Sequence, residues 1–270
     1  MSVLQEIVAN TREEVAQRRA GTPRAALERR CAEVPPARDF EGALRPAPGA
    51  VRLIAEVKKA SPSRGVLAQD LDPATLASTY AGHGADAISV LTDRKYFRGS
   101  LEDLRAVRAA VDVPLLRKDF TVDEYQLWES RATGADAILL IVSILDRHSL
   151  GDLLAAAKGM GLAALVECHT VAEVDRALSA GARILGLNNR DLATFETRIE
   201  TTLELLPSIP PGPIVVSESG FFTGADVRRV VTAGAHAVLV GEGLVRAADL
   251  PAKIRELKLR EEHGRYDAKG

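Results

Sequence analysis

Apolar and polar positions follow two patterns along this chain. From Leu53 onward, short apolar runs typical of buried strands are separated by longer stretches with apolar residues three and four positions apart. The stretches Leu101–Arg108 and Ala172–Leu178 have this helical spacing. The apolar runs lie near residues 53, 87, 113, 137, 163, 184, 213 and 237. Strands and helices that alternate in this way predict a parallel (β/α)8 barrel, the TIM barrel.

A repeated motif supports the barrel. The segments that start at Gly84 and Gly134 both begin Gly-Ala-Asp-Ala-Ile, and looser copies start at Gly181 and Gly234. Each copy joins a glycine at a helix end to a buried strand, and the copies recur at about two βα units. A doubly wound open sheet is the alternative, but no Gly-x-Gly-x-x-Gly pattern follows an early strand.

The N-terminal residues have a different pattern. Apolar residues from Leu4 to Val15 lie at helical spacing, a second helical segment follows Pro23, and residues 34–49 form a proline-rich connector. A segment of about 45 residues seldom builds its own core. We therefore expect residues 1–48 to form a helical extension packed on a barrel of residues 49–270, within a single domain.

Composition narrows the classes of function. The chain has 46% hydrophobic and 27% charged residues, ordinary values for a soluble globular protein. A net charge of -2 gives no electrostatic case for nucleic acid, and the apolar segment 137–145 is too short to span a bilayer. Cys31 and Cys168 suggest neither a disulfide framework nor a metal site, and no signal peptide is visible. We expect a cytoplasmic protein with no nucleic-acid or membrane partner.

Ionisable and amide side chains come late in several predicted strands. Because side chains alternate faces along a strand, Ile54, Glu56 and Lys58 share one face. The same alternation groups Leu116 with Lys118, Leu165 with Glu167, Gly186 with Asn188 and Arg190, and Val216 with Glu218. One such pair alone would be read as a core ion pair. A consistent face on every strand favours an active site at the barrel mouth, where the C-terminal strand ends meet.

Such a mouth suits acid–base chemistry. Close charge pairs and burial shift pKa values apart. A lysine beside carboxylates stays protonated and can act as an acid, whereas a lysine crowded by positive charge can become a base or nucleophile. The sequence leaves both environments open.

The last two predicted strands indicate a phosphate site. Residues Ser217–Gly220 end the seventh strand, and Gly241–Gly243 end the eighth, just before a helical run at 244–248. Glycines let backbone N–H groups approach an anion, and a helix N-terminus favours negative charge. Barrels often bind phosphate at this place.

Histidines and aromatic residues add less. The five histidines, His83, His148, His169, His236 and His263, show no paired ligand spacing, so no metal is expected. His169 is expected to face away from Glu167 and to be packing or surface. Phe97 and Phe120 follow predicted strands and are equally compatible with a core or rim position and with gripping an aromatic substrate.

Several motifs together resemble the indole-3-glycerol phosphate synthase family. They lie at residues 56–63, 95–100, 116–120, 165–167, 186–192 and 217–220, and the similarity spans all the predicted strands and the N-terminal extension. Lys-Asp-Phe, Asn-Asn-Arg-Asp-Leu and Ser-Glu-Ser-Gly in this order are specific together. The departures are Cys168, Gly243 and a polar tail beyond Leu259. Only Gly243 touches the expected function, and a glycine there should not harm phosphate binding.

The resemblance implies a cofactor-free step of tryptophan biosynthesis on 1-(2-carboxyphenylamino)-1-deoxyribulose 5-phosphate. The ring closes onto the sugar carbonyl, carbon dioxide and water leave, and indole-3-glycerol phosphate results. Lys118 is implied as the acid, Glu167 as the base and Lys58 as a second acid. The remaining implied catalytic residues are Glu56, Asn188 and Ser219. Implied substrate contacts are Ser61, Phe97, Phe120, Arg190, Glu218 and Leu239, and implied phosphate contacts are Ser219, Gly220, Gly241, Glu242 and Gly243.

Other readings stay open. A related phosphosugar isomerase would want a carboxylate–cysteine or two-aspartate pair at the strand ends, and a Schiff-base aldolase would use Lys118 as nucleophile. A catalytically silent phosphosugar-binding subunit would bind without turnover. We expect a monomer or weak homo-oligomer, with Ser61, Pro62 and Gly65 in a mobile cover over the mouth.

Overall fold

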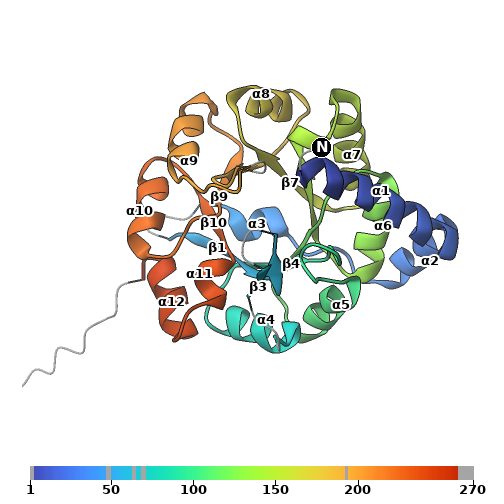
Figure 1. Ribbon diagram of the computed structural model, residues 1–270, viewed down its shortest axis with the longest axis horizontal. Coiled ribbons are helices and arrows are strands. Elements are labelled where there is room, and N and C mark those ends of the chain that lie inside the picture. The colour runs from blue at the N-terminus through green and yellow to red at the C-terminus, as the bar shows by residue number, and fades with distance from the viewer. Residues whose placement is uncertain (1–2, 47–49, 63–64, 68–70, 192–193, 261–270) are drawn as a thin grey trace, which may run out of the picture.

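The parallel strands close into a barrel in the computed structural model, which describes residues 3–46, 50–62, 65–67, 71–191 and 194–260. The barrel strands are β1 (Arg52–Val57), β4 (Ala87–Leu91), β5 (Leu115–Lys118), β6 (Ala137–Ile141), β7 (Ala163–Cys168), β8 (Ile184–Asn188), β9 (Ile214–Glu218) and β10 (Ala237–Val240). Each strand pairs in parallel with the next along the chain, and β10 pairs with β1 (Figure 1). The (β/α)8 prediction is confirmed, because a doubly wound open sheet would not close in this way.

Helices follow the strands around the outside of the barrel (Figure 1). They are α4 (Pro73–Gly82), α5 (Leu101–Ala110), α6 (Glu124–Thr133), α7 (Arg147–Gly159), α8 (Val171–Ser179), α9 (Glu200–Leu205), α10 (Gly224–Thr232), α11 (Glu242–Val245) and α12 (Leu250–Leu257), with 3-10 turns at Val142–Ile144 and Leu206–Ser208. Most begin at an Asp, Ser or Thr whose side chain accepts an N–H of the first turn, for example Asp72, Ser100 and Thr170. The helix after the eighth barrel strand was predicted to begin at Leu244. This start was wrong, because α11 already includes Glu242 and Gly243.

The predicted faces of the strands are confirmed. Ile54, Leu116, Leu165 and Val216 belong to one buried cluster inside the barrel. The alternate residues of β1, which are Leu53, Ala55 and Val57, pack against the surrounding helices instead. The late polar residues of the strands therefore lie above an apolar interior.

The Gly-Ala-Asp-Ala repeat has a structural role at the N-terminal end of the barrel. Asp86 donates its N–H to the Leu53 carbonyl, and its carboxylate accepts the Leu53 N–H at 2.8 Å. Asp136 makes the same pair of bonds with Leu115. In the last copy His236 accepts a backbone N–H of β9 through Nδ1 at 2.9 Å. The repeat thus ties successive strands together at this end.

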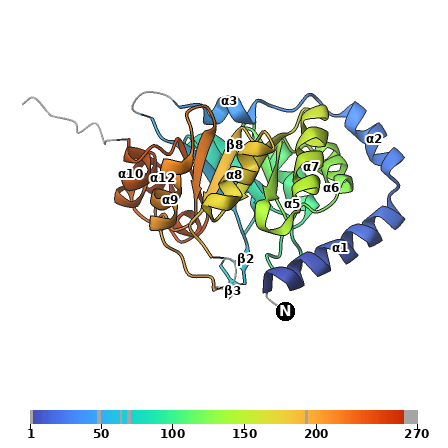
Figure 2. The ribbon, with the colours of Figure 1, turned by 90° about the horizontal axis from the view of Figure 1, so that it is seen from above.

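The N-terminal extension forms α1 (Val3–Gly21) and α2 (Arg24–Glu33), which lie beside α6 (Figure 1). Arg18 binds Glu129 of α6 at 2.8 Å, and the Tyr125 hydroxyl donates to two backbone carbonyls of the extension. The proline-rich connector contains a helix that the sequence did not predict, α3 (Phe40–Leu44). Its buried Phe40 and Leu44 close the end of the barrel opposite the α1 N-terminus (Figure 2).

The loop after β1 contains a short antiparallel pair, β2 (Ala60–Ser61) and β3 (Gly65–Val66). The pair lies at the same end of the molecule as the start of α1 (Figure 2). Residues 63 and 64 of the predicted cover, residue 192 of the Asn-Asn-Arg-Asp-Leu motif, His263 and the rest of the tail beyond residue 260 lie outside the described residues. In the described part of the chain, no helix combines the length and the apolar character needed to cross a membrane.

Candidate active site

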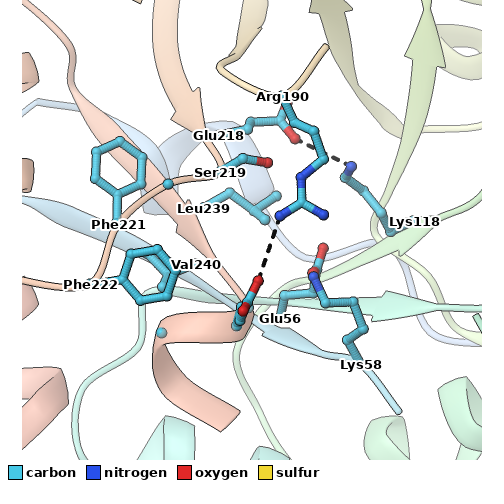
Figure 3. Close-up of a pocket in the computed structure, with 14 residues that line it drawn as sticks. Glu56, Lys58, Lys118, Arg190, Glu218, Ser219, Phe221, Phe222, Leu239 and Val240 are labelled. Carbon is cyan, nitrogen blue, oxygen red and sulfur yellow. Dashed lines mark ion pairs between the residues drawn. The ribbon is translucent and has the colours of Figure 1, made fainter. Parts of the chain in front are cut away.

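Charged side chains from opposite sides of the barrel meet at its mouth. Lys118 Nζ, at the end of β5, lies 3.3 Å from Glu167 Oε2 of β7 and 3.3 Å from Glu218 Oε2 of β9. Figure 3 shows Lys118 and Glu218 reaching toward one another across the pocket. Gly186 of β8 makes room for this pair, because a Cβ there would lie 2.0 Å from a Glu218 oxygen. The convergence predicted from strand alternation is confirmed.

Burial and charge act in opposite directions on these groups. Burial alone would lower the pKa of Lys118, but Glu218, Glu167 and Glu56 outweigh burial and raise it above its usual value. Burial raises the pKa of Glu218 to about 7, although Lys118 opposes that shift. Glu167 is also buried, yet Lys118, His169 and a hydrogen bond from Asn188 hold its pKa below the usual value. These charges favour the ammonium form of Lys118, which lies beside two carboxylates of different basicity.

A second ion pair stands beside the first. Lys58 Nζ lies 2.8 Å from Glu56 Oε1, and both residues line the mouth (Figure 3). Burial would raise the pKa of Glu56, but Lys58 and Lys118 hold it below its usual value. Lys59, the next residue, points outward and binds Asp103 of α5. Alternation along this strand therefore separates two adjacent lysines into different environments.

The turns after β9 and β10 line one part of the mouth. Ser219 and Gly220 have positive φ angles of 70° and 89°, which turn the backbone sharply after β9. Gly243 lets the turn after β10 approach the turn after β9 closely, because a Cβ at this position would lie 2.2 Å from the Phe221 carbonyl oxygen. About 400 Å³ of empty space lies here. The predicted residues around this space are Glu56, Lys58, Lys118, Arg190, Glu218, Ser219, Gly220, Leu239, Gly241, Glu242 and Gly243.

Arg190 borders the same space, and two arginines pair with Glu242. Arg190 lies 3.6 Å from Glu242 Oε2, and Arg246 lies 3.2 Å from Glu242 Oε1. The Glu242 carboxylate would repel an anion, so any phosphate contact of this residue has to come from its backbone. The Ser219 N–H donates to the Leu239 carbonyl at 3.4 Å. The Ser219 hydroxyl faces the pocket (Figure 3).

A more apolar pocket adjoins the charged one. It has about 660 Å³ of empty space, and its predicted lining residues are Glu56, Lys58, Ser61, Phe97, Lys118, Phe120, Asn188, Arg190 and Ser219. The rings of Phe97 and Phe120 are 6.2 Å apart. The pocket also contains Phe195, which the sequence did not single out and which has a positive φ of 61°. The Asp93 carboxylate accepts the Phe97 N–H and thereby fixes the loop that carries this ring.

Several polar atoms at the mouth have no hydrogen-bond partner within the described part of the protein. They are Ser61 Oγ and both carboxylate oxygens of Glu218. Buried polar groups in proteins are almost always hydrogen-bonded to protein or to water. These atoms are therefore available to a polar ligand or to water.

Two features of the mouth were missed or misread. Arg117 is buried behind Lys118, where it binds Asp119 at 2.8 Å and Glu129 at 3.4 Å. Alternation puts Arg117 on the helix-facing side, where a charge needs such partners. The expectation for His169 was wrong: it lies two residues after Glu167, shares its face, and brings Nε2 to 3.5 Å from Glu167 Oε1.

The described residues contain no group of three or more His, Cys, Asp or Glu side chains arranged to hold a metal ion. Cys31 and Cys168 are both free. The charged groups of the mouth are instead lysines and arginines paired with carboxylates, an arrangement that can move protons and bind anions.

Comparisons with known proteins identify the family. The family model described as "Indole-3-glycerol phosphate synthase" matches residues 4–257. The indole-3-glycerol phosphate synthase of Roseiflexus sp. (strain RS-1) is 52% identical over 264 residues, which cover 95% of this chain and 98% of that protein. The one from Laribacter hongkongensis (strain HLHK9) is 48% identical over 258 residues, or 94% and 98% of the two chains. Among solved structures, 3-hexulose-6-phosphate synthase from Salmonella typhimurium superimposes with a TM-score of 0.63 at 16% identity, over 77% of this chain and 97% of that one. That last likeness shows the fold alone.

Proposed function

The chain belongs to the indole-3-glycerol phosphate synthase family, and from this premise we propose which side chains perform the reaction and how. The enzyme is a carboxy-lyase of tryptophan biosynthesis that acts on a phosphorylated substrate. Its substrate is 1-(2-carboxyphenylamino)-1-deoxyribulose 5-phosphate. A carbon–carbon bond forms between the ring and the sugar carbonyl, carbon dioxide leaves, and loss of water gives indole-3-glycerol phosphate.

Lys118 is the general acid for ring closure. As the ring carbon attacks the carbonyl carbon, the carbonyl oxygen gains negative charge and needs a proton. Glu167 and Glu218, both 3.3 Å from its Nζ, keep Lys118 protonated until that moment. This placement of the lysine is the observation that carries the proposal, since a positioned acid accelerates proton transfer by about 10²–10⁴-fold.

Glu167 is the base for dehydration, and Lys58 assists departure of the hydroxyl group. Asn188, whose side chain helps to lower the pKa of Glu167, orients the carboxylate. Glu56 holds Lys58 at 2.8 Å in the same way. Ser219, whose hydroxyl faces the pocket, contributes a polar contact to the reacting sugar.

The two adjoining pockets suit the two ends of the substrate. We place the phosphate near Arg190, Ser219 and the backbone of Gly220 and Gly241–Gly243, where glycine lets the chain approach an anion. We place the carboxyphenyl ring against Phe97 and Phe120, and the sugar against Ser61, Glu218 and Leu239. The buried oxygens of Ser61 and Glu218, which accept no hydrogen bond from the described residues, would then accept hydrogen bonds from sugar hydroxyl groups.

The electrostatics of Lys118 disfavour the aldolase alternative. A Schiff base requires a neutral lysine amine, whereas the carboxylates around Lys118 raise its pKa and favour the ammonium form. The mouth also has a lysine–glutamate arrangement in place of the carboxylate–cysteine or aspartate pair that an isomerase would need.

We propose a cytoplasmic enzyme that needs no cofactor and acts as a monomer or weak homo-oligomer. Residues 1–48 and the barrel of residues 49–270 act as one domain, in keeping with the bond between Arg18 and Glu129. Sedimentation and a single unfolding transition would test the last two statements.

The test is formation of fluorescent indole product from the carboxyphenylamino substrate, with a chelator present. The wild-type protein is expected to turn over. Lys118→Ala and Glu167→Gln are expected to lose about 10²–10⁴-fold in kcat while keeping their far-ultraviolet circular dichroism. Full activity in both variants would contradict the mechanism, and absence of wild-type turnover would contradict the reaction.

A further inference from the structure

His169 lies beside Glu167, the proposed base, and has none of the roles assigned above. Its Nε2 lies 3.5 Å from Glu167 Oε1, on the side of the carboxylate opposite the oxygen that meets Lys118. The Nε2 atom is buried and has no hydrogen-bond partner in the described part of the chain. At this distance the two groups form an ion pair when the imidazole is protonated.

Glu173 fixes the histidine from the other side. Its Oε2 lies 3.4 Å from His169 Nδ1 and accepts the His169 backbone N–H at 2.7 Å. Glu173 sits in the first turn of α8, where its own N–H is bound by the Thr170 side chain. The helix start therefore anchors the carboxylate that orients the ring, and a chain of contacts runs Glu173–His169–Glu167–Lys118.

The charges around the histidine favour its protonated form. They are Glu167 on β7, Glu173 on α8 and Glu218 on β9. Burial lowers the pKa of His169, but the three carboxylates outweigh it and raise the pKa above the usual value. A protonated His169 gives Glu167 a second cationic neighbour besides Lys118.

We propose that His169, held by Glu173, is a positioning residue that orients the Glu167 carboxylate and sets its basicity. This inference rests on the proposed role of Glu167 as base. A histidine between two carboxylates fixes the direction of the reactive one, as outer groups do for ligands and bases elsewhere. With its back oxygen held, Glu167 presents Oε2 toward Lys118 and the pocket.

A purely structural histidine would pack in the same place, so the test uses the pH dependence of turnover. Removing the imidazolium takes a positive neighbour from Glu167 and raises the pKa of this carboxyl. A base acts when deprotonated, so the rise of kcat with pH should move to higher pH. In His169→Gln we expect this limb to shift by about one pH unit. At neutral pH, where the profile levels off, we expect kcat of this variant to be about tenfold lower than that of the wild type. Its KM should stay within about twofold of the wild-type value.

Matched variants separate the explanations. Glu173→Gln keeps an oxygen to accept the His169 N–H but loses the charge, and a smaller shift in the same direction is expected. The exposed His148 gives a control, and His148→Gln should reproduce the wild-type pH profile. In the double variant His169→Gln/Glu167→Gln, the histidine change should cost nothing further, because its effect passes through Glu167.

The outcomes distinguish this proposal from the proposed function. An active wild type whose pH profile superimposes on that of His169→Gln would overturn the role of His169 and leave the reaction intact. An inactive wild type would overturn the reaction. In that case nuclear magnetic resonance titration of the imidazole decides the contact itself: the pKa of His169 should fall in Glu167→Gln, and an unchanged pKa would refute the coupling.

Discussion

The two ends of the barrel hold buried charge in different ways. At the N-terminal end, both oxygens of Asp136 are engaged, by the N–H groups of Leu115 and Arg38 and by the Arg108 guanidinium. Both oxygens of Asp86 are likewise engaged, by a backbone N–H, an arginine and a lysine. Each carboxylate there links strands or connectors to one another.

At the mouth, the contacts of Lys118 and Glu218 are longer and incomplete. Lys118 lies 3.3 Å from each of two carboxylates, and neither oxygen of Glu218 has a hydrogen bond within the described residues. Such groups lose solvation without full compensation from the protein. Each closed-end carboxylate thus ties strands together through a complete set of partners, whereas Glu218 at the mouth is left open to a substrate at a cost in stability.

The largest expected effect separates two adjacent lysines. Lys58→Ala should lower kcat/KM by about 10³-fold, because it removes a cation and a proton donor from the mouth. Lys59→Ala removes only the outward pair with Asp103 and should stay within about threefold of the wild type. Steady-state kinetics on the two variants measures the contrast. Equal losses would show that the strand face does not determine the role.

A smaller effect is expected at the closed end, where a substitution should change the free energy of unfolding and leave the catalytic rate unchanged. Asp136→Asn should lower the free energy of unfolding by about 2–3 kcal/mol, because Arg108 and two backbone N–H groups lose their charged acceptor. Asp112→Asn is the control: this exposed aspartate binds Arg38 at 2.9 Å and should contribute less than about 0.5 kcal/mol. Urea unfolding gives both values. A fall in kcat of Asp136→Asn without loss of stability would contradict the comparison.

Glu218 should show the smallest effect and the opposite sign. Its pKa is about 7 in the folded protein and about 4.3 in an unfolded chain. Between these values the folded state binds a proton that the unfolded state lacks, so this group makes stability fall as pH rises toward 7.

Removing that ionisation tests the sign. Glu218→Gln should raise the free energy of unfolding by about 1–2 kcal/mol at pH 8, have little effect at pH 4, and lower kcat/KM at both. Urea unfolding of the variant and the wild type at the two pH values measures the difference. Destabilisation by the same amount at both pH values would show that Glu218 is a structural ion-pair partner.

Alternating polarity predicted much of this arrangement. Ile54, Glu56 and Lys58 share the inward face because strand geometry leaves no choice once one of them is placed. The strand order follows from the same rules, since short βα connections place consecutive strands side by side. The gathering of late polar residues at one mouth then follows from parallel strands.

What the sequence could not predict depends on contacts between distant segments. Phe195 enters the apolar pocket through a loop turn with positive φ, which no local pattern marks. The helix at Phe40–Leu44 forms in a proline-rich connector because two of its apolar residues fill the closed end of the barrel. His169 is a different case, because simple alternation just beyond β7 does pair it with Glu167; here the sequence contained the signal and the expectation misread it.

The central claim, that mouth charge serves turnover and closed-end charge serves folding, has one direct test. Indole formation is measured for Lys118→Ala and Asp136→Asn side by side, at a temperature where both are folded. We expect a loss of at least about 10²-fold for Lys118→Ala and a wild-type rate for Asp136→Asn. A wild-type rate for Lys118→Ala, or equal losses in both, would contradict it.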